Sequence, residues 1–175
     1  MANYASYLRP ALAERLLRWE KFDAEKRCRD AKIPCCAVLD VGGDYIGARS
    51  IGGYAPLLNR DGTTVYYVIN PFRPWSATLE HIDQVLGETL GVSHVELARL
   101  RLVGNPNLGP ETTPADVAEG ARRLWELVSP YKPVDYLCVR RELCAALPEG
   151  LPCPVLPIRL WLTYPWAAGP EPDAP

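Results

Sequence analysis

We organise the fold around the stretch Cys36-Ala-Val-Leu-Asp-Val-Gly-Gly-Asp-Tyr-Ile-Gly-Ala-Arg-Ser-Ile-Gly-Gly53. An apolar run ends at Asp40, the pair Gly42-Gly43 follows, and a second apolar run extends from Tyr45 to Ile51. Two apolar runs around a glycine turn predict a β-hairpin, with an acid at the end of its first strand.

A third extended run, Thr63 to Ile69, comes after Asp61-Gly62. Its β-branched and aromatic residues are typical of a strand. An Asp-Gly pair between two such runs favours a hairpin turn with Gly62 at positive φ. We therefore expect an α/β (or α+β) domain. Its mixed sheet should start as a three-stranded antiparallel meander, flanked by amphipathic helices.

Capping residues predict two helices after the meander. One begins at Ser76 and ends near Leu90, before Gly91. The other begins at Thr113-Pro114 and buries one apolar stripe. Its members are Val117, Ala121, Leu124 and Val128.

The C-terminal third of the chain predicts two more strands and a short helix. Residues 134–139 form an apolar run, and residues 140–147 are predicted to be helical. Residues 155–163 alternate in polarity, with the leucines and Ile158 on the buried side. Pro157 places that strand at an edge of the sheet.

We divide the chain into an N-terminal amphipathic helix within residues 1–34, one α/β domain at 35–166 and a disordered tail at 167–175. The helix covers about residues 9–29, and its apolar side chains recur every three or four positions. They are Leu12, Leu16, Trp19 and Phe22. We interpret this stripe as packing on the domain; a partner-binding helix is the alternative.

The composition is that of a soluble globular protein, with a formal charge of −2 over 175 residues. No apolar run is long enough for a membrane span, so we expect a cytoplasmic protein without a membrane partner. The six cysteines, at 28, 35, 36, 138, 144 and 153, are then expected to be reduced thiols. A structural zinc site remains the alternative, although no C-x-x-C pair is present.

Two short motifs carry a resemblance to a known family. Leu39-Asp-Val-Gly-Gly-Asp-Tyr-Ile-Gly-Ala48 is similar to an aspartate-x-glycine turn and its second strand, and Val103-Gly-Asn-Pro106 to a later turn. On these motifs, residues 36–140 resemble the ribonuclease H-like fold, in particular the Holliday-junction-resolvase relatives. The resemblance implies a nuclease that uses Mg²⁺ or Mn²⁺. Asp40 would be a metal ligand and catalytic acid.

The other acids of such a site are open. Asp135 is the candidate for a late catalytic acid, with Glu142 as the alternative. Two metal ions need more carboxylates than the motif supplies, so we expect weak cleavage or none. In the alternative interpretation, Asp40 and Asp44 only hydrogen-bond the turn.

Residues 83–102 have a competing resemblance, to the helix-turn-helix of bacterial repressors. Gly91 would form the turn, and Ser93 with Glu96 would cap the second helix. Its nucleic-acid-binding side chains would be His94, Arg99 and Arg101. The same residues also alternate as in a strand, so helix and strand both remain open for residues 93–103.

These patterns favour an accessory protein that binds nucleic acid or a partner protein without robust catalysis. The alternatives are the metal-dependent nuclease centred on Asp40, the helix-turn-helix DNA-binding protein and a protein–protein interaction module. Aromatic and proline-rich segments at 71–75 and 164–166 are candidate contact surfaces for the last of these.

Overall fold

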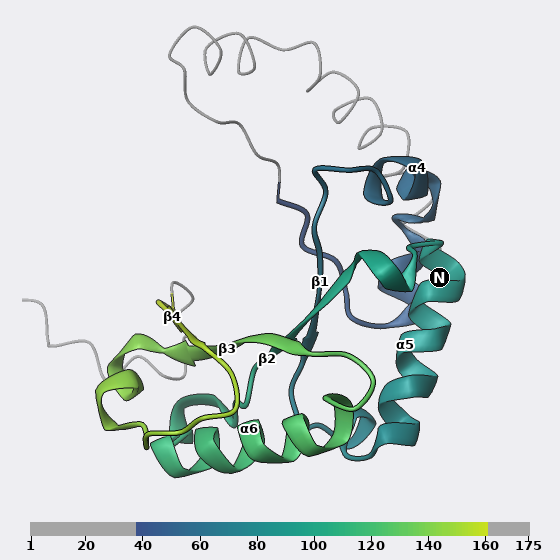
Figure 1. The fold of residues 1–175 in the computed structure, drawn as a ribbon. Coiled ribbons are helices and arrows are strands. Elements are labelled where there is room, and N and C mark those ends of the chain that lie inside the picture. Colours follow the sequence, from purple (N-terminus) through teal and green to yellow (C-terminus); the bar gives the residue numbers. More distant parts are fainter. Residues whose placement is uncertain (1–37, 161–175) are drawn as a thin grey trace, which may run out of the picture.

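The structure, a computed structural model, describes residues 38–160 (Figure 1). At its centre lie the strands β1 (Val65–Ile69), β2 (Leu100–Gly104), β3 (Val134–Arg140) and β4 (Val155–Ile158). They are arranged in the order β1-β2-β3-β4, and every neighbouring pair is parallel. The α/β content agrees with the prediction, but the mixed sheet with an antiparallel meander is wrong.

The connections explain the parallel order. Helix α5 (Leu79–Ser93) joins β1 to β2, and helix α6 (Pro114–Val128) joins β2 to β3. A crossover helix carries the chain back along the sheet, so the next strand runs in the same direction as the last. A 3-10 segment, Arg141–Ala146, and a loop make the last connection, from β3 to β4.

The segment that was predicted to be a hairpin is mostly helical. The Asp44 carboxylate accepts a hydrogen bond from the Gly47 N–H at 2.7 Å and caps helix α3 (Tyr45–Arg49). A 3-10 turn and the short helix α4 (Ala55–Leu58) follow. The strand predicted from Tyr45 to Ile51 is therefore wrong, because a local cap starts a helix there.

Glycine is required at two positions of this region, for two different structural reasons. A Cβ atom on Gly47 would lie 2.6 Å from the Gly42 oxygen, so the glycines allow two backbone segments to touch. Gly62 has φ 85°, which confirms its predicted positive φ. Its turn joins α4 to β1, however, and not two strands.

The two long helices were predicted with different accuracy. The α6 prediction is confirmed, with a capping box between Thr113 and Asp116. Helix α5 begins after Thr78 instead of at Ser76 and continues through Gly91. It ends at the C-cap residue His94, whose φ of 57° is left-handed, and not before Gly91 as predicted.

Residues 93–103 do not form a second helix. They contain one 3-10 turn, Leu97–Arg99, and then enter β2. The strand alternative is correct from Leu100 onward, and the helix required by the helix-turn-helix interpretation is not formed. Strand β4 lies at the sheet edge as predicted, but Leu156 is 46 % exposed and not buried.

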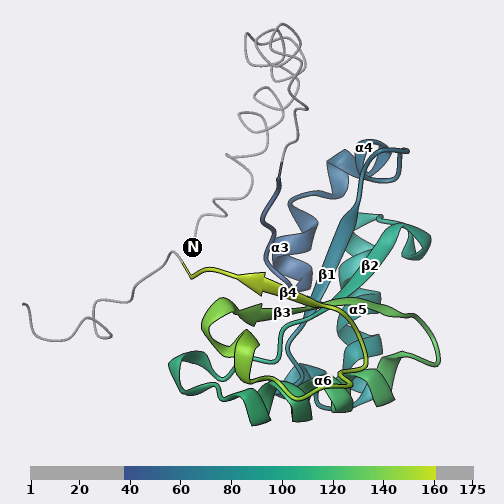
Figure 2. The same ribbon diagram turned by 60° about the vertical axis from the view of Figure 1, so that its left-hand side comes forward.

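The core lies on one face of the sheet. Strand residues Ile69, Leu102 and Leu137 pack there against α6 and against Ile82 of α5. A second cluster at the other end of β2 joins Leu100 to α4 and α5. It also contains Leu58 and Val95, with Leu86 and Leu90 packed against it. We call the face of the sheet that carries both clusters the covered face. Figures 1 and 2 show α6 running along it.

The opposite surface, which we call the open face, carries the alternate strand residues. It includes Tyr66, Val68, Arg101, Val103, Tyr136, Cys138 and Leu156. Tyr66 is 51 % exposed and Val68 is 55 % exposed, whereas Ile69 beside them is 2 % exposed. No helix of the described residues packs on this face.

The predicted helix at 9–29 and the predicted tail at 167–175 lie outside the described residues. Within residues 38–160, no helix has both the length and the apolar character needed to cross a membrane.

Candidate functional site

The two predicted acids do not form a common metal site with other ligands. Asp40 is exposed in the segment before α3. Asp135, on β3, accepts hydrogen bonds from Arg101 Nε at 2.8 Å and Arg101 Nη2 at 3.0 Å. Across residues 38–160, no group of three or more His, Cys, Asp or Glu side chains is placed to hold a metal ion.

The three predicted nucleic-acid-binding residues do not share one element. His94 is exposed at the end of α5, and its carbonyl accepts a hydrogen bond from the Asn59 side chain. Arg99 lies in the 3-10 turn, 3.0 Å from the Asp61 carboxylate. Arg101 lies on β2 and points to the open face. The structure therefore joins Arg101 to Asp135, candidates from two competing interpretations, as an ion pair.

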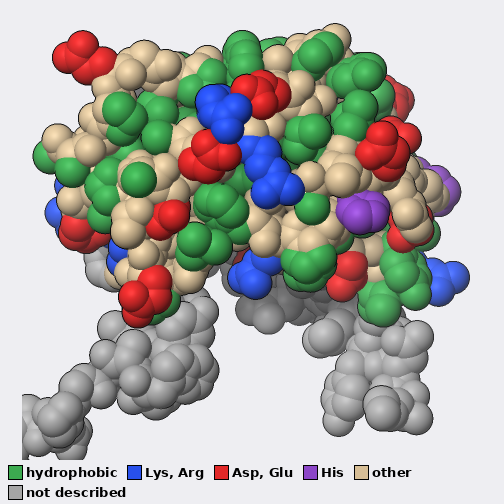
Figure 3. Space-filling view, turned by 90° about the horizontal axis from the view of Figure 1, so that it is seen from below, with side chains coloured by type: hydrophobic (Ala, Val, Ile, Leu, Met, Phe, Trp, Pro, Cys, Tyr) green, Lys and Arg blue, Asp and Glu red, His purple; other side chains and the backbone are tan. Residues whose placement is uncertain are grey.

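The surface of the molecule on which α6 lies carries both acidic and basic side chains. Figure 3 shows acidic and basic side chains interspersed with apolar ones there. On α6 itself, Arg122 pairs with Glu119 at 2.8 Å and with Glu126 at 2.7 Å. A surface of paired charges lacks the basic stripe expected of a duplex-binding face.

The carboxyl ends of the parallel strands give a different candidate site. In open parallel sheets, ligands bind in the crevice outside these ends. An Asn-Pro pair directly follows two neighbouring strands, as Asn70-Pro71 after β1 and Asn105-Pro106 after β2. Arg140 is the last residue of β3. These polar residues meet at one edge because all the strands run the same way.

Asn70 ties the first two of these loops together. Its Nδ2 donates to the Asn107 carbonyl at 2.7 Å, and its Oδ1 accepts from the Phe72 N–H at 3.1 Å. The Asn105 N–H donates to the Ile69 carbonyl at 2.8 Å. The Asn70 side chain is therefore used in holding the loops.

Thr112 and Asn107 fix the approach to α6. The Thr112 hydroxyl donates to the Gly109 carbonyl at 2.7 Å and accepts from the Leu108 N–H at 2.9 Å. Asn107 Oδ1 accepts from the Gly109 N–H at 2.6 Å. This network positions the carbonyls that Arg140 reaches.

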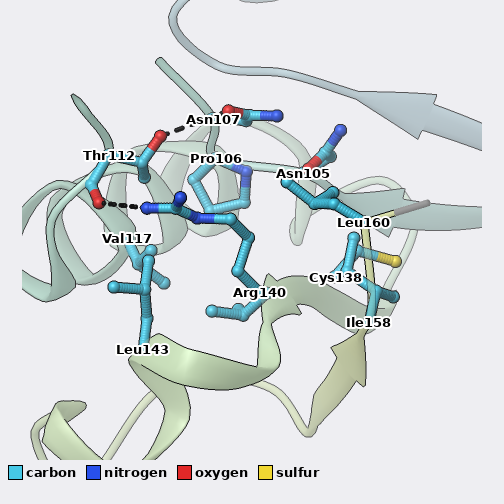
Figure 4. Close-up of a pocket in the computed structure, with 11 residues that line it drawn as sticks. Asn105, Pro106, Asn107, Thr112, Val117, Cys138, Arg140, Leu143, Ile158 and Leu160 are labelled. Atoms are coloured by element: carbon cyan, nitrogen blue, oxygen red, sulfur yellow. Dashed lines mark hydrogen bonds between the residues drawn. The ribbon is translucent and has the colours of Figure 1, made fainter. Parts of the chain in front are cut away.

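Arg140 extends from β3 to the loop before α6 (Figure 4). Its Nη2 donates to the Thr112 carbonyl at 3.0 Å and to the Pro110 carbonyl at 3.1 Å. Its Nε is buried and has no hydrogen-bond partner among the described residues. A buried unpaired donor costs about 1–3 kcal/mol, so this atom needs an acceptor that the described chain does not supply.

A small hollow lies beside Arg140. Its walls come from the ends of β3 and β4, the loop after β2 and the first turn of α6. Its lining includes Asn105, Thr112, Cys138, Leu143, Ile158 and Leu160. The free volume is about 20 Å³, which is room for one water-sized group. It therefore admits one oxygen of a ligand, not a cofactor-sized molecule.

The thiol in the hollow is not activated. Burial raises the pKa of Cys138 above its ordinary value, so the group is a neutral thiol at neutral pH. The thiolate is the nucleophilic form of cysteine, so this environment disfavours covalent chemistry at Cys138.

Comparison of the chain with protein-family models, with curated proteins and with solved structures finds no match. The candidate site is therefore defined by its geometry.

The carboxyl-edge residues were missed because the predicted sheet was antiparallel. The signal that could have found them is the repeated Asn-Pro pair after two predicted strands. Arg140, which follows the predicted run 134–139, is the third such residue. In a parallel sheet all three positions converge, whereas in a meander they alternate between opposite edges.

Proposed function

We propose that this chain is a non-catalytic binding protein that receives a carboxylate of a partner protein at the carboxyl edge of its sheet. The observation that carries the proposal is the buried, unpaired Nε of Arg140 beside a hollow with room for one ligand atom. An arginine N–H is a donor only, and its strong partners are carboxylate and phosphate oxygens.

The surrounding charge supports an anionic ligand. Exposed arginines follow three of the strands: Arg73 after β1, Arg141 after β3 and Arg159 after β4. Glu111 and Glu142 offset part of this charge. A local excess of positive charge in an acidic protein attracts an anion to this edge.

Binding is favoured over catalysis because the polar groups at the edge already have structural partners. Asn70, Asn107 and Thr112 hold loops, and Cys138 is a neutral thiol. A protein carboxylate is favoured over a nucleic acid because the chain has a net charge of −2 and the α6 side lacks a basic stripe. Nucleic acid remains an outcome of the test.

The test observes the Arg140 side chain directly. In a ¹H–¹⁵N spectrum of the full chain, we expect the Arg140 Nε–H signal to shift saturably on addition of acetate. Arg140→Lys keeps the charge but removes Nε, so it should abolish acetate binding in a protein whose spectrum stays dispersed. Arg141→Lys, at an exposed neighbour, is the matched control and should leave binding unchanged.

Two further ligands separate the sources of the anion. A short peptide with a free C-terminal carboxylate should bind more tightly than its amidated form. A 5′-phosphorylated oligonucleotide that bound better than the peptide would favour a nucleic-acid end instead. If acetate and the peptide gave no saturable shift, or if both lysine variants behaved alike, the proposal would be wrong.

A further inference from the structure

The open face leaves an all-parallel sheet covered on one side only. All-parallel sheets occur almost only with both faces covered, because both faces of their strands are apolar. Here Tyr66 and Val68 on β1 and Leu156 on β4, the two edge strands, are each at least 46 % exposed, whereas Val103 between them is 6 % exposed. The outer strands of this face therefore lack a covering layer among the described residues.

The ends of the described chain point to where that layer comes from. In both views, the first and the last coloured segments of the chain lie away from α6 (Figures 1 and 2). Thirty-seven residues precede residue 38 in the sequence. The polypeptide thus supplies ample chain on the side where the covering layer is missing.

The sequence of residues 9–29 fits that layer. Its apolar stripe from Leu12 to Phe22 spans ten helical rises, or about 15 Å. Four strands span three inter-strand spacings, or about 14 Å. The eight residues 30–37 reach up to about 28 Å, which is enough to carry a helix back across the sheet.

A helix is also the suitable structure for this surface. The strands of the open face already pair with one another, so a covering segment must satisfy its own backbone hydrogen bonds. A helix does so, whereas the C-terminal segment 161–175 contains four prolines, each of which lacks the N–H. The charged residues Glu14 and Lys21, opposite the apolar stripe, then face solvent.

We infer that residues 9–29 of the same chain dock as an amphipathic helix on the open face, through Leu12, Leu16, Trp19 and Phe22. The inference goes beyond the proposed function and does not depend on the Arg140 hollow. It makes the N-terminal segment the occupant of the open face. A second copy of the chain and a separate protein are the competing occupants.

Two native cysteines make a matched pair of reporters. Cys138 lies on the open face, is partly buried and also lines the Arg140 hollow, and Cys153 is 8 % exposed in the core of the covered face. In the full chain we expect both thiols to react slowly with iodoacetamide, as followed for each cysteine by peptide mass spectrometry. The double variant Leu16→Gln/Trp19→Gln should speed the reaction of Cys138 by at least about tenfold.

The reaction of Cys153 should not change in that variant, because the covered face stays intact. Glu14→Gln/Lys21→Gln, on the opposite side of the same helix, should leave both rates unchanged. Acceleration of Cys153 as well would mean that the variant unfolds generally. In that case, backbone hydrogen exchange at β3 tests whether residues 9–29 dock. A faster exchange rate at β3 in the Leu16/Trp19 variant, under conditions where the variant is still folded, supports docking. An unchanged exchange rate overturns the inference.

Three further results would overturn the inference. Rapid reaction of Cys138 in the unmodified chain would mean that the face is open and is left for a separate protein. Protection of Cys138 that disappears on dilution would assign the face to a second copy. Equal Cys138 rates in the Leu16/Trp19 variant and the Glu14/Lys21 variant would exclude residues 9–29 as the covering segment.

Discussion

The covered and open faces of the sheet come from alternate residues of the same four strands, yet their surroundings differ sharply. Leu137 is fully buried on the covered face, while Leu156 of the neighbouring strand is 46 % exposed on the open face. Both faces carry apolar side chains, and the open face also carries the Arg101–Asp135 ion pair. The difference teaches that the alternation of side chains along a strand predicts which residues share a face of the sheet. It does not predict which segment of the chain covers that face.

The energetic consequence is that the described residues are stabilised from one side. Burial contributes roughly 25 cal/mol for each Å² of apolar surface removed from water. The covered face gains this contribution from α5 and α6, and the open face gains it only when another layer docks. Substitutions on the two faces therefore measure how much more the covered face contributes to the free energy of unfolding than the open face does.

The largest difference is expected between Leu137→Ala and Leu156→Ala. Leu137 is enclosed by α6 and the sheet, so its truncation should lower the free energy of unfolding by about 2–5 kcal/mol. Leu156 lies on the edge strand, where even a docked helix covers it incompletely, so its loss should be about 1 kcal/mol or less. Urea denaturation of both variants makes the measurement. Equal losses would break the comparison.

Close approach of α6 to the sheet gives the next prediction. A Cβ atom on Gly104 of β2 would lie 2.7 Å from Leu137 Cδ2 and 2.9 Å from Leu124 Cδ2. Gly104→Ala should therefore cost about 1–3 kcal/mol through overpacking. The control is Gly87→Ala on α5, where no atom lies within 4 Å of the added Cβ. That change should stabilise by about 0.5–1 kcal/mol, and a stabilising Gly104→Ala would contradict this packing.

The features of the covered face were largely predictable from sequence. The α6 stripe repeats at helical spacing and its start has a cap, so both the helix and its buried face are correct. The strands β1 and β3 are likewise predicted from their apolar runs. These signals are local, and the tertiary structure agrees with them.

The region before β1 was not predictable in the same way. Tyr45 and Ile46 favour a strand by propensity, but the Asp44 cap and the close contact of Gly42 with Gly47 select a helical turn. The error spread to the whole sheet, because an initial hairpin implies antiparallel pairing. The helix-strand alternation from Val65 onward already favoured parallel strands.

The candidate site depends on this topology. Arg140 and Thr112 are 28 residues apart, and only the parallel crossover through α6 brings them into contact. No sequence spacing predicts an unpaired Nε, because the pairing of a side chain is decided by packing. Asn70 and Asn105 could have been recognised once the strands were taken as parallel.

A smaller effect is expected at the start of α6, which anchors the covered face. Thr113→Ala removes the capping hydroxyl and should cost about 1 kcal/mol at pH 7. Hydrogen bonds from the Thr113 hydroxyl and then its backbone N–H lower the pKa of Asp116 in the folded protein. The stability from this lowered pKa is therefore present above the unfolded-state pKa of about 4 and is lost as the pH falls through the folded value.

The pH dependence separates the cap from general damage. The difference in unfolding free energy between the wild type and Thr113→Ala should shrink below about pH 4, as Asp116 becomes protonated. Asp116→Asn should reproduce the low-pH behaviour at neutral pH. A Thr113→Ala deficit that stayed constant from pH 7 to about pH 3 would rule out this coupling.

The smallest effect is expected for the ion pair of the open face. The side chains of Arg101 and Asp135 are 47 % and 19 % exposed, so water and salt screen much of their attraction. Asp135→Asn should lower the melting temperature by less than Thr113→Ala does, and the difference should vanish in about 1 M salt, where the Debye length is about 3 Å. Val134→Ala, in the core beside it, should show a deficit that salt does not remove. A large, salt-resistant loss in Asp135→Asn would mean that Arg101 is left as an unpaired charge away from water. The docked segment would then lie over this pair, and the two faces would be less unequal than their exposed side chains indicate.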